Sequence, residues 1–301
     1  MELKELTLKI ISKGSSNYPN LLKEIPDPPS KIYALGNMPE DPLAGRLRIS
    51  IVGTRKATLQ GRSIAKEIAK KLSEQGMVVV SGLAMGIDTA AHEGALAGGG
   101  QTIAVLACGL DAIYPRQNEN LAKKIIETAG AIISEYPVGT PALPNQFLAR
   151  NRIVSGLSIA TIIIEAPRES GSLVTARLAA EQGREVFVFP GPVNHHNYYG
   201  SHKLIRDGAR LVSSIEDILE DLSEIFNLQL SIFNQTAKFK LDEIKDENQL
   251  SIIKVIKEAG QPLNIDKIIG LTKLEPQIVN QAIARLMIEE VVKETEKGYT
   301  I

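Results

Sequence analysis

The chain has 301 residues, of which 44% are hydrophobic and 23% are charged, and its formal net charge is −1. This composition is typical of an ordinary globular protein, and the length suits one large domain and one small one. The near-zero charge excludes a general attraction to nucleic acids, so any site for a polyanion must be a local patch. The single cysteine, Cys108, excludes an internal disulfide and is expected to be a small core residue.

Two further classes of protein are excluded by the hydrophobic pattern. No hydrophobic run approaches the roughly 20 residues that a membrane helix needs. The first ten residues, MELKELTLKI, lack the hydrophobic segment of a signal peptide. We therefore predict a cytoplasmic protein with no membrane partner.

Residues 1–47 are predicted to form an N-terminal extension. The segment 31–37, KIYALGN, is typical of one extra strand and a turn. Pro28 and Pro29 mark another turn, because proline fixes its own φ and restricts the residue before it. The extension is too short for a full domain, so we expect it to pack at an edge of the core sheet.

Strands and helices alternate from residue 48 to residue 222. Ile49 to Val52 and Met77 to Val80 are hydrophobic runs that end in glycine or Ser-Gly, with a helix-period segment between them. The alternation predicts an α/β fold with a doubly wound, mostly parallel sheet of about six or seven strands. Strands are expected at 48–52, 77–80, 102–106, 131–133, 159–164, 185–189 and 210–212, and helices at 58–75, 87–97, 117–129, 147–157, 172–182 and 201–207.

A second unit is predicted at the C-terminal end of the sequence. Residues 223–248 are polar and weakly periodic, which is typical of a linker. Residues 249–301 contain three helical patterns and a terminal hairpin, the arrangement of a small winged-helix domain. From Leu250 onward the sequence contains seven basic and seven acidic residues, so this unit has no net charge. Arg285 is the one basic residue in the expected recognition helix. We therefore predict an interaction or dimerisation module rather than a reader of duplex DNA.

Glycine-rich turns precede three of the predicted core helices. Parallel sheets place their ligand sites outside the carboxyl ends of the strands, where these turns should lie. Glycine lets a ligand approach the backbone closely, and a helix N-terminus favours an anion. The alternative is that these glycines serve only tight turns, with the nearby cations on solvated faces. The turns contain Gly53, Thr54, Gly82, Gly86, Gly171 and Ser172, and the nearby cations are Arg55, Lys56, Arg62, Arg150, Arg152, Arg168 and Lys203.

Motifs for cofactors and catalysis are sparse. The first turn lacks the G-x-G-x-x-G pattern of dinucleotide sites, and no P-loop occurs, so no NAD or ATP cofactor is expected. Asp88 and His92 lie four residues apart on one helical face, which we interpret as a capping aspartate and a hydrogen-bonded core histidine. Glu135 and Glu165 end strands that we expect to be neighbours, so an acid–base pair is a weaker alternative.

A metal site is the remaining chemical alternative. His195, His196 and His202 lie within one short stretch, but no cysteine accompanies them and no acidic partner is evident. We interpret them as residues of a solvated loop, and predict no metal and no catalytic residues.

Seven segments of the chain resemble one known family in their order and spacing. They are IVGTR, SGLAMGIDTAAHEGAL, GLDAIYP, ISEYPVG, RNRIVSGLS, IIIEAPRESGSLVTARLA and VFVFPGP. This pattern is similar to that of the DNA processing protein A (DprA/Smf) family, from about Tyr18 to Leu222, with a looser match in the C-terminal unit. The usual proline before the RNR segment is absent, since Leu148 and Ala149 precede it, and His202 stands where asparagine is common.

The resemblance implies a non-enzymatic protein with an extended Rossmann-like domain that binds single-stranded DNA without sequence preference. It implies a homodimer that protects incoming strands and helps to load the RecA recombinase during natural transformation, or competence, and DNA recombination. The helical SAM-like domain found before the core in many members is expected to be absent or vestigial here. The residues predicted to bind nucleic acid are Gly53, Thr54, Arg55, Ser81, Gly82, Gly86, Arg150, Asn151, Arg152, Ser170, Gly171, Ser172 and Lys203.

One alternative function and one auxiliary prediction complete the interpretation. A nucleotide hydrolase of the lysine-decarboxylase-like fold would share the glycine loops, but it normally carries P-G-G-x-G-T-x-x-E. Here the corresponding region is ESGSLVTARLA, with Arg177 near the expected catalytic glutamate. Aromatic residues are few, and Phe147 and Tyr114 are the best candidates for stacking on bases.

Overall fold

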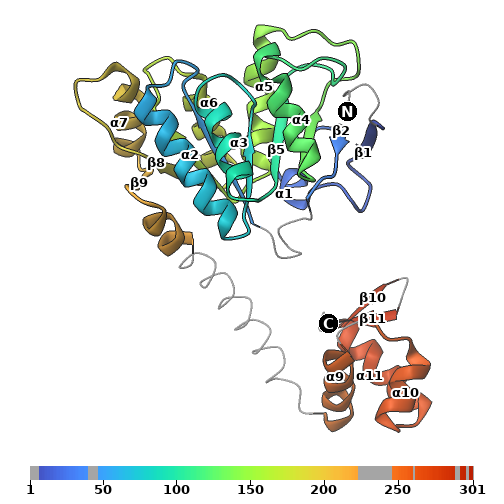
Figure 1. Ribbon diagram of the computed structural model, residues 1–301. Coiled ribbons are helices and arrows are strands. Elements are labelled where there is room, and N and C mark those ends of the chain that lie inside the picture. Colours follow the sequence, from blue (N-terminus) through green and yellow to red (C-terminus); the bar gives the residue numbers. More distant parts are fainter. Residues whose placement is uncertain are drawn as a thin grey trace. The chain divides into compact units, whose positions relative to one another are not determined.

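The computed structural model describes residues 7–39, 47–222, 246–259, 262–288, 292–295 and 298–300. The chain divides into two compact units, residues 1–219 and residues 220–301, each drawn in Figure 1 and described here by itself. No helix of the described residues is long and hydrophobic enough to cross a membrane.

The first unit is built on a nine-stranded sheet in the order β1-β2-β6-β5-β4-β3-β7-β8-β9. The seven strands from β6 to β9 in this order are parallel to their neighbours. The predicted doubly wound, mostly parallel α/β sheet is therefore confirmed. The strands are β1 (Lys9–Ser12), β2 (Lys31–Gly36), β3 (Arg48–Gly53), β4 (Val78–Ser81), β5 (Thr102–Leu106), β6 (Ala131–Ser134), β7 (Ala160–Ile164), β8 (Glu185–Val188) and β9 (Arg210–Leu211).

The N-terminal segment supplies the antiparallel edge of this sheet. β2, the strand expected at 31–37, pairs antiparallel with β6, and Tyr33 lies opposite Ser134. β1 extends the edge by pairing antiparallel with β2, with Lys9 opposite Ala34. A short helix, α1 (Asn20–Lys23), connects this hairpin to α5 through buried Leu22, whose side chain lies near Gly156.

Helices cover both faces of the sheet, as the hydrophobic strands require. Figure 1 shows α2, α3 and α4 lying side by side over one face, while α5 and α6 contact each other over the other. One hydrophobic cluster joins Val52, Val80 and Val105 to Val154 of α5, and a second joins Leu106 to Ile125 of α4. The helices are α2 (Leu59–Glu74), α3 (Ile87–Ala97), α4 (Glu119–Glu127), α5 (Pro144–Gly156), α6 (Gly171–Glu181) and α7 (Tyr199–Arg206).

Local sequence sets the ends of these helices. The Thr58 side chain accepts a hydrogen bond from Gly61 N at the start of α2, and Gly76, with φ of 79°, follows its last turn. Ser170 caps α6 in the same way by accepting from Ser172 N. α5 begins at Pro144, three residues before its predicted start, because proline occupies the first helical position and lacks only an N–H that would be unpaired there.

The second unit contains three helices and a hairpin. Asn264 caps α10 by accepting from Lys267 N at 2.9 Å, and Pro276 opens α11. A hydrophobic core that includes Ile252, Ile268 and Leu286 joins the three helices. Most of the predicted linker lies outside the described residues, and its last two residues belong to α9. The elements are α9 (Glu247–Ala259), α10 (Ile265–Thr272), α11 (Pro276–Ile288), β10 (Lys293–Thr295) and β11 (Gly298–Thr300), the two strands being antiparallel.

Candidate nucleic-acid interface

A pocket of about 510 Å³ opens where the strand order reverses. The chain winds outward from β3 through β4 and β5 to β6, then returns to place β7 on the other side of β3. The loops after β3 and β7 therefore part above the sheet and leave a crevice at their carboxyl ends, the usual ligand position in such folds. The first turns of α5 form one wall of this pocket.

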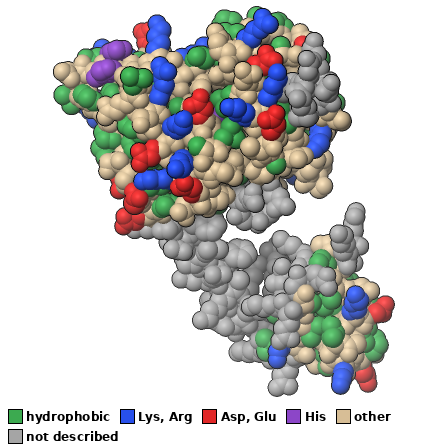
Figure 2. Space-filling view, viewed as in Figure 1, with side chains coloured by type: hydrophobic (Ala, Val, Ile, Leu, Met, Phe, Trp, Pro, Cys, Tyr) green, Lys and Arg blue, Asp and Glu red, His purple; other side chains and the backbone are tan. Residues whose placement is uncertain are grey.

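The pocket brings together nine of the thirteen residues predicted to bind nucleic acid. They come from segments that are far apart in the sequence: the end of β3, the turn after β4, the middle of α5 and the start of α6. They are Gly53, Thr54, Arg55, Gly82, Arg150, Asn151, Ser170, Gly171 and Ser172. On the face of the first unit drawn in Figure 2, basic and acidic side chains are interspersed.

A stack of three side chains forms one rim of the pocket. The guanidinium carbon of exposed Arg55 lies 4.8 Å from the ring centroid of Phe147. The Phe147 ring lies 5.4 Å from that of Tyr114, at an interplanar angle of 57°. Tyr114 is 48% exposed, so the stack presents both a cation and aromatic surface to solvent. Such a pair offers a phosphate partner and a stacking surface for a base.

The floor of the pocket contains a buried cation beside a buried acid. Arg150 Nη1 donates to the carbonyl oxygens of Gly82, at 2.8 Å, and Val105. Burial lowers the pKa of Arg150 to about 10, while Asp88 acts in the opposite direction. Burial raises the pKa of Asp88, and Arg150 opposes that change. A Cβ at position 82 would lie 2.5 Å from Arg150 Nη2, so Gly82 is needed to admit this guanidinium.

The N-terminus of α2 is occupied by a carboxylate of the protein itself. Glu165, fully buried at the end of β7, accepts from Thr58 N at 2.9 Å and from the Thr58 hydroxyl. Asn197 Nδ2 and the Tyr198 hydroxyl donate to the same carboxylate, at 2.9 and 3.2 Å. Burial, and then Glu165, raise the pKa of Tyr198 to about 12. The first turn of α2 is therefore not the open anion site that the sequence predicted.

The turn before α3 is closed in a similar way. Asp88 Oδ2 accepts from Gly82 N at 3.1 Å and from Ala84 N at 3.3 Å. These are backbone groups that the glycine pattern assigned to a ligand. Of the three glycine turns, the one before α6 differs, because the neutral Ser170 hydroxyl caps this helix and no buried carboxylate does so among the described residues.

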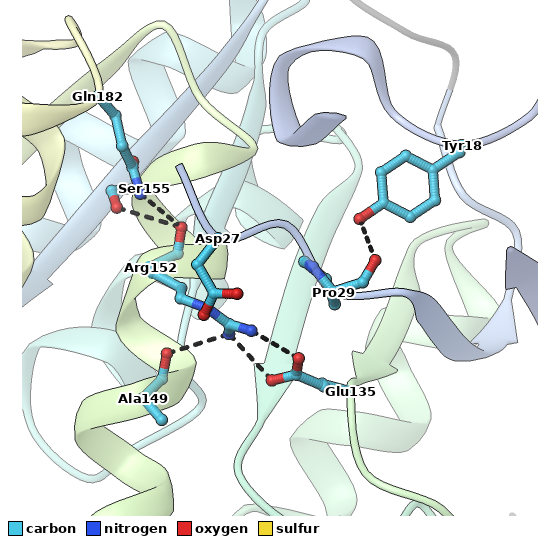
Figure 3. A network of polar contacts seen from close by, with 8 residues as sticks. All are labelled: Tyr18, Asp27, Pro29, Glu135, Ala149, Arg152, Ser155 and Gln182. Atoms are coloured by element: carbon cyan, nitrogen blue, oxygen red, sulfur yellow. Dashed lines mark hydrogen bonds and ion pairs between the residues drawn. The ribbon is translucent and has the colours of Figure 1, made fainter. Parts of the chain in front are cut away.

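The structure places Arg152 outside the pocket, although Arg150 lies two residues before it. Arg152 points to the other side of α5, where Nη1 donates to Glu135 Oε2 at 2.9 Å and Nε donates to Asp27 Oδ2 at 2.9 Å (Figure 3). Nη2 pairs with the second oxygen of Glu135 at 2.5 Å. Two carboxylates thus neutralise this guanidinium and connect α5 to the N-terminal segment and to the end of β6.

Three other predicted residues also lie outside the pocket, for different reasons. Ser81 is fully buried and its hydroxyl donates to Ile51 O at 2.7 Å. Gly86 has a φ of 86°, and a Cβ there would lie 2.4 Å from Thr54 O, so glycine is required by the turn. Lys203 is exposed on α7, beyond the pocket.

The fold does not support the two residue pairs that the sequence offered for acid–base chemistry. Glu135 and Glu165 do not end neighbouring strands, because β5, β4 and β3 lie between β6 and β7. His92 Nδ1 lies 2.7 Å from the Thr102 hydroxyl, which itself donates to Val79 O, so His92 bonds to Thr102 and not to Asp88. Burial lowers the pKa of His92 to about 3. The interpretation of His92 as a hydrogen-bonded core histidine is confirmed, whereas Asp88 bonds the backbone of the turn before α3 instead of capping the helix.

The histidine stretch and the cysteine also have local roles. His195 Nδ1 accepts from Asn197 N at 3.2 Å, and His202 Nε2 contacts Gly191 O at 3.0 Å. The described ranges contain no group of three or more His, Cys, Asp or Glu side chains placed to hold a metal ion. Cys108 is buried in the cluster around α4, as predicted.

One pocket residue and one buried hydrogen-bond centre were missed by sequence analysis. Glu169 lines the pocket and brings a negative charge to it, because the turn after β7 carries it beside Ser170. Glu165 acts as a buried hydrogen-bond centre with Asn197 and Tyr198. A threonine at the N-cap of α2 was a signal for a capped helix, but nothing local indicated that the cap would bond to a strand 107 residues away.

Comparisons with known proteins agree with this architecture. The model of the DNA recombination-mediator protein A family matches residues 9–223. Protein Smf of Escherichia coli is 41% identical over 213 residues, which cover 71% of this chain and 56% of that protein. The chain therefore matches little more than half the length of that relative.

Two solved structures share the fold of the first unit. The DNA processing protein A of Streptococcus pneumoniae is 38% identical, with a TM-score of 0.65 over 73% of this chain and 75% of that one. The protein of the same name from Helicobacter pylori, whose structure addresses its single-stranded DNA binding mode, is 32% identical, with a TM-score of 0.64 over 74% and 99%. On the extent of the family match and these identities, the chain belongs to the DNA recombination-mediator protein A family.

Proposed function

We propose that this protein binds single-stranded DNA without base-sequence preference, at the pocket of the first unit. The observation that carries the proposal is the Arg55–Phe147–Tyr114 stack on the rim of that pocket, in a chain of this family. A single strand offers repeated phosphates and exposed bases, and the rim offers a guanidinium and aromatic faces at matching sites. The related Helicobacter pylori protein, described for its single-stranded DNA binding mode, supports the same assignment.

The helix start at Ser170–Ser172 is the second element of the proposed site. Its N-terminus carries partial positive charge and is not capped by a buried carboxylate, so it favours a phosphate. Arg150 adds positive potential from the floor without direct exposure, since it is only 4% exposed. Glu169 and Asp88 oppose these charges, which limits the affinity and makes the rim contacts decisive.

The test is a titration of oligo-dT by fluorescence anisotropy over a series of salt concentrations. Arg55→Ala removes an exposed cation and should reduce the slope of log affinity against log salt by about 0.7. Arg152→Ala is the matched control, because its charge is already neutralised by Glu135 and Asp27, so its slope should equal that of the wild type. Equal slopes for Arg55→Ala and the wild type would move the DNA site away from this rim.

Base preference is tested with the same assay. Phe147→Ala should weaken binding by about tenfold, which is within the range expected for the loss of one stacked base. The loss should be similar for oligo-dT, oligo-dC and mixed strands. A strong preference for one base would contradict recognition of the backbone.

We also propose that the protein is not an enzyme. In ESGSLVTARLA, Arg177 stands near the position where a nucleotide hydrolase of similar fold carries its catalytic glutamate. Release of ribose phosphate from nucleoside monophosphates, lost on Asp88→Asn or Glu169→Gln, would overturn this point and identify a hydrolase.

The proposed role in the cell is recombination mediation by a homodimer in the cytoplasm. The protein would protect incoming strands and help to load RecA on them. A shorter lag in the DNA-dependent ATPase activity of RecA on single strands that carry this protein would support this role. Light scattering would measure the mass of the protein in solution and so test the dimer. Absence of any effect on RecA, with strand binding intact, would leave only the binding function.

The second unit is proposed to be a winged-helix interaction or dimerisation module. Arg285 is the basic residue in the last turn of α11, and basic and acidic residues are equal in number from Leu250 onward. Duplex recognition by a helix requires a cationic face for the phosphates. The charge balance therefore favours a protein partner or a second copy.

A further inference from the structure

A second arginine–aromatic pair lies exposed beside the pocket. The guanidinium carbon of Arg168 lies 5.1 Å from the ring centroid of Tyr199. Arg168 is exposed and Tyr199 is 38% exposed. Lys203 follows Tyr199 by one helical turn, so the two side chains share a face of α7.

This pair lies beside the turn after β7, which forms part of the pocket wall, whereas the Arg55–Phe147–Tyr114 stack comes from other segments of the chain. Arg168 stands between Pro167 and Glu169, both of which line the pocket. The start of α7 is hydrogen-bonded to the same turn, because Gly200 N donates to Ala166 O at 2.8 Å and Ala166 N donates to Ser201 Oγ at 3.1 Å. Tyr199 is therefore held close to the edge of the pocket.

The buried carboxylate of Glu165 connects the segments that carry the two arginine–aromatic pairs. Asn197 Nδ2 donates both to Glu165 and to Lys56 O, the latter at 3.1 Å, which joins the segment before α7 to the loop that carries Arg55. Tyr198, next to Tyr199, donates to the same carboxylate. One buried centre thus supports both the Arg55 loop and the Tyr199 platform.

We propose that Arg168, Tyr199 and Lys203 form a second nucleotide platform, which extends the single-stranded DNA site across the turn before α6. This inference rests on the proposed function of the pocket. Its basis is the repetition of one chemical arrangement, an exposed guanidinium over an aromatic ring that is at least partly exposed, at two places beside one crevice. A polymer with a base and a phosphate in each repeat occupies both places when it is long enough to cross the pocket. A strand bound on this platform would also place a phosphate within reach of Lys203, which lies outside the pocket.

The experiment measures affinity against strand length with the full chain. Wild type, Tyr199→Ala and Arg168→Ala are titrated with oligo-dT from about 4 to about 20 nucleotides. The variants should match the wild type on the shortest strands and bind the longest about tenfold more weakly, the effect expected for one lost stack. Arg168→Ala and Lys203→Ala should each reduce the salt slope on long strands by about 0.7, whereas Tyr199→Ala should leave it unchanged.

Two controls separate this inference from the function on which it rests. Tyr199→Phe keeps the ring and should bind as the wild type does, and Lys70→Ala removes an exposed cation paired with Glu74 on α2 and should have no effect. If Tyr199→Ala binds every length as the wild type does, or loses affinity equally at all lengths, the second platform is wrong while the pocket stands. If the wild type binds no strand at any salt concentration, both proposals fail.

Discussion

The helix N-termini on the two sides of the pocket contact different chemical groups. On the side of β3 and β4, Glu165 accepts hydrogen bonds from the start of α2, and Asp88 accepts from the turn before α3. On the side of β7, Ser170 caps α6 with a neutral hydroxyl, and the start of that helix lines the pocket. The first side is closed by the protein's own carboxylates, and the second remains available to an anion.

This difference separates structural glycine turns from binding turns. A glycine before a helix indicates that an anion is favoured there, but that anion can be a side chain of the same chain. A carboxylate from another strand fills the position at α2, where the sequence predicted a ligand. Three predictions test the contrast, beginning with the largest effect, and a fourth tests the second unit.

Glu165→Ala should destabilise the first unit most. The substitution leaves buried donors of Thr58, Asn197 and Tyr198 without their acceptor, which should cost about 3 kcal/mol or more in the free energy of unfolding. The melting temperature should fall by roughly 6 to 12 °C for a unit of this size. Glu165→Gln keeps the shape of the side chain and one acceptor oxygen, so its free energy of unfolding should fall by less. A change below about 1 kcal/mol for Glu165→Ala would show that this carboxylate is not a structural centre.

His92 should make the stability of the closed side depend on pH. Its folded-state pKa of about 3 lies below the ordinary value of 6.5, so the unfolded chain takes up the proton first as the pH falls. The contribution of neutral His92 to the free energy of unfolding is fully present above pH 6.5 and is lost as the pH falls towards 3. From neutral pH to about pH 5 the wild type should lose roughly 1.5 to 2 kcal/mol more than His92→Asn, measured by denaturant unfolding.

The opposing titration of Asp88 does not obscure that comparison. Burial raises its pKa, so its protonation favours the folded state as the pH falls. Both chains contain Asp88, and the difference between them isolates His92. Parallel stability curves for the two chains would contradict the buried, neutral histidine.

Ser170→Asp should convert the open helix start into one of the closed type. Aspartate caps a helix about as well as serine, so stability should be unchanged within about 0.5 kcal/mol. The added charge should repel a phosphate and weaken oligo-dT binding by roughly threefold to tenfold. Ser170→Asn, an equally good but neutral cap, should bind as the wild type does. If Ser170→Asp bound oligo-dT as tightly as the wild type does, the start of α6 would not be part of the DNA site.

Arg285→Ala should have the smallest effect. If the second unit does not bind nucleic acid, loss of this exposed cation should leave the affinity for both duplex and single-stranded DNA within about twofold. Arg55→Ala in the first unit serves as the positive control. A reduced salt slope for duplex binding by Arg285→Ala would instead support a reader of duplex DNA.

The sequence by itself determined the local elements of this protein. Hydrophobic periodicity located β5 at residues 102–106 without error, and it placed α2 within one residue at each end. Thr58 and Gly76 marked the two ends of that helix, because capping and a positive φ depend on neighbouring residues. The family pattern and the polar residues at the carboxyl ends of strands were also sufficient to select nine residues of one pocket.

Only the tertiary structure decided which of these residues face the pocket and which face each other. Arg150 and Arg152 are close in sequence, yet α5 directs one to the floor and the other to Glu135 and Asp27. Glu165 reaches Thr58 because the strand order places β7 beside β3, whereas Glu135 is carried three strands away. Strand order is set by the packing of distant segments, and no local pattern encodes it, so the partners of a charged side chain follow from the fold alone.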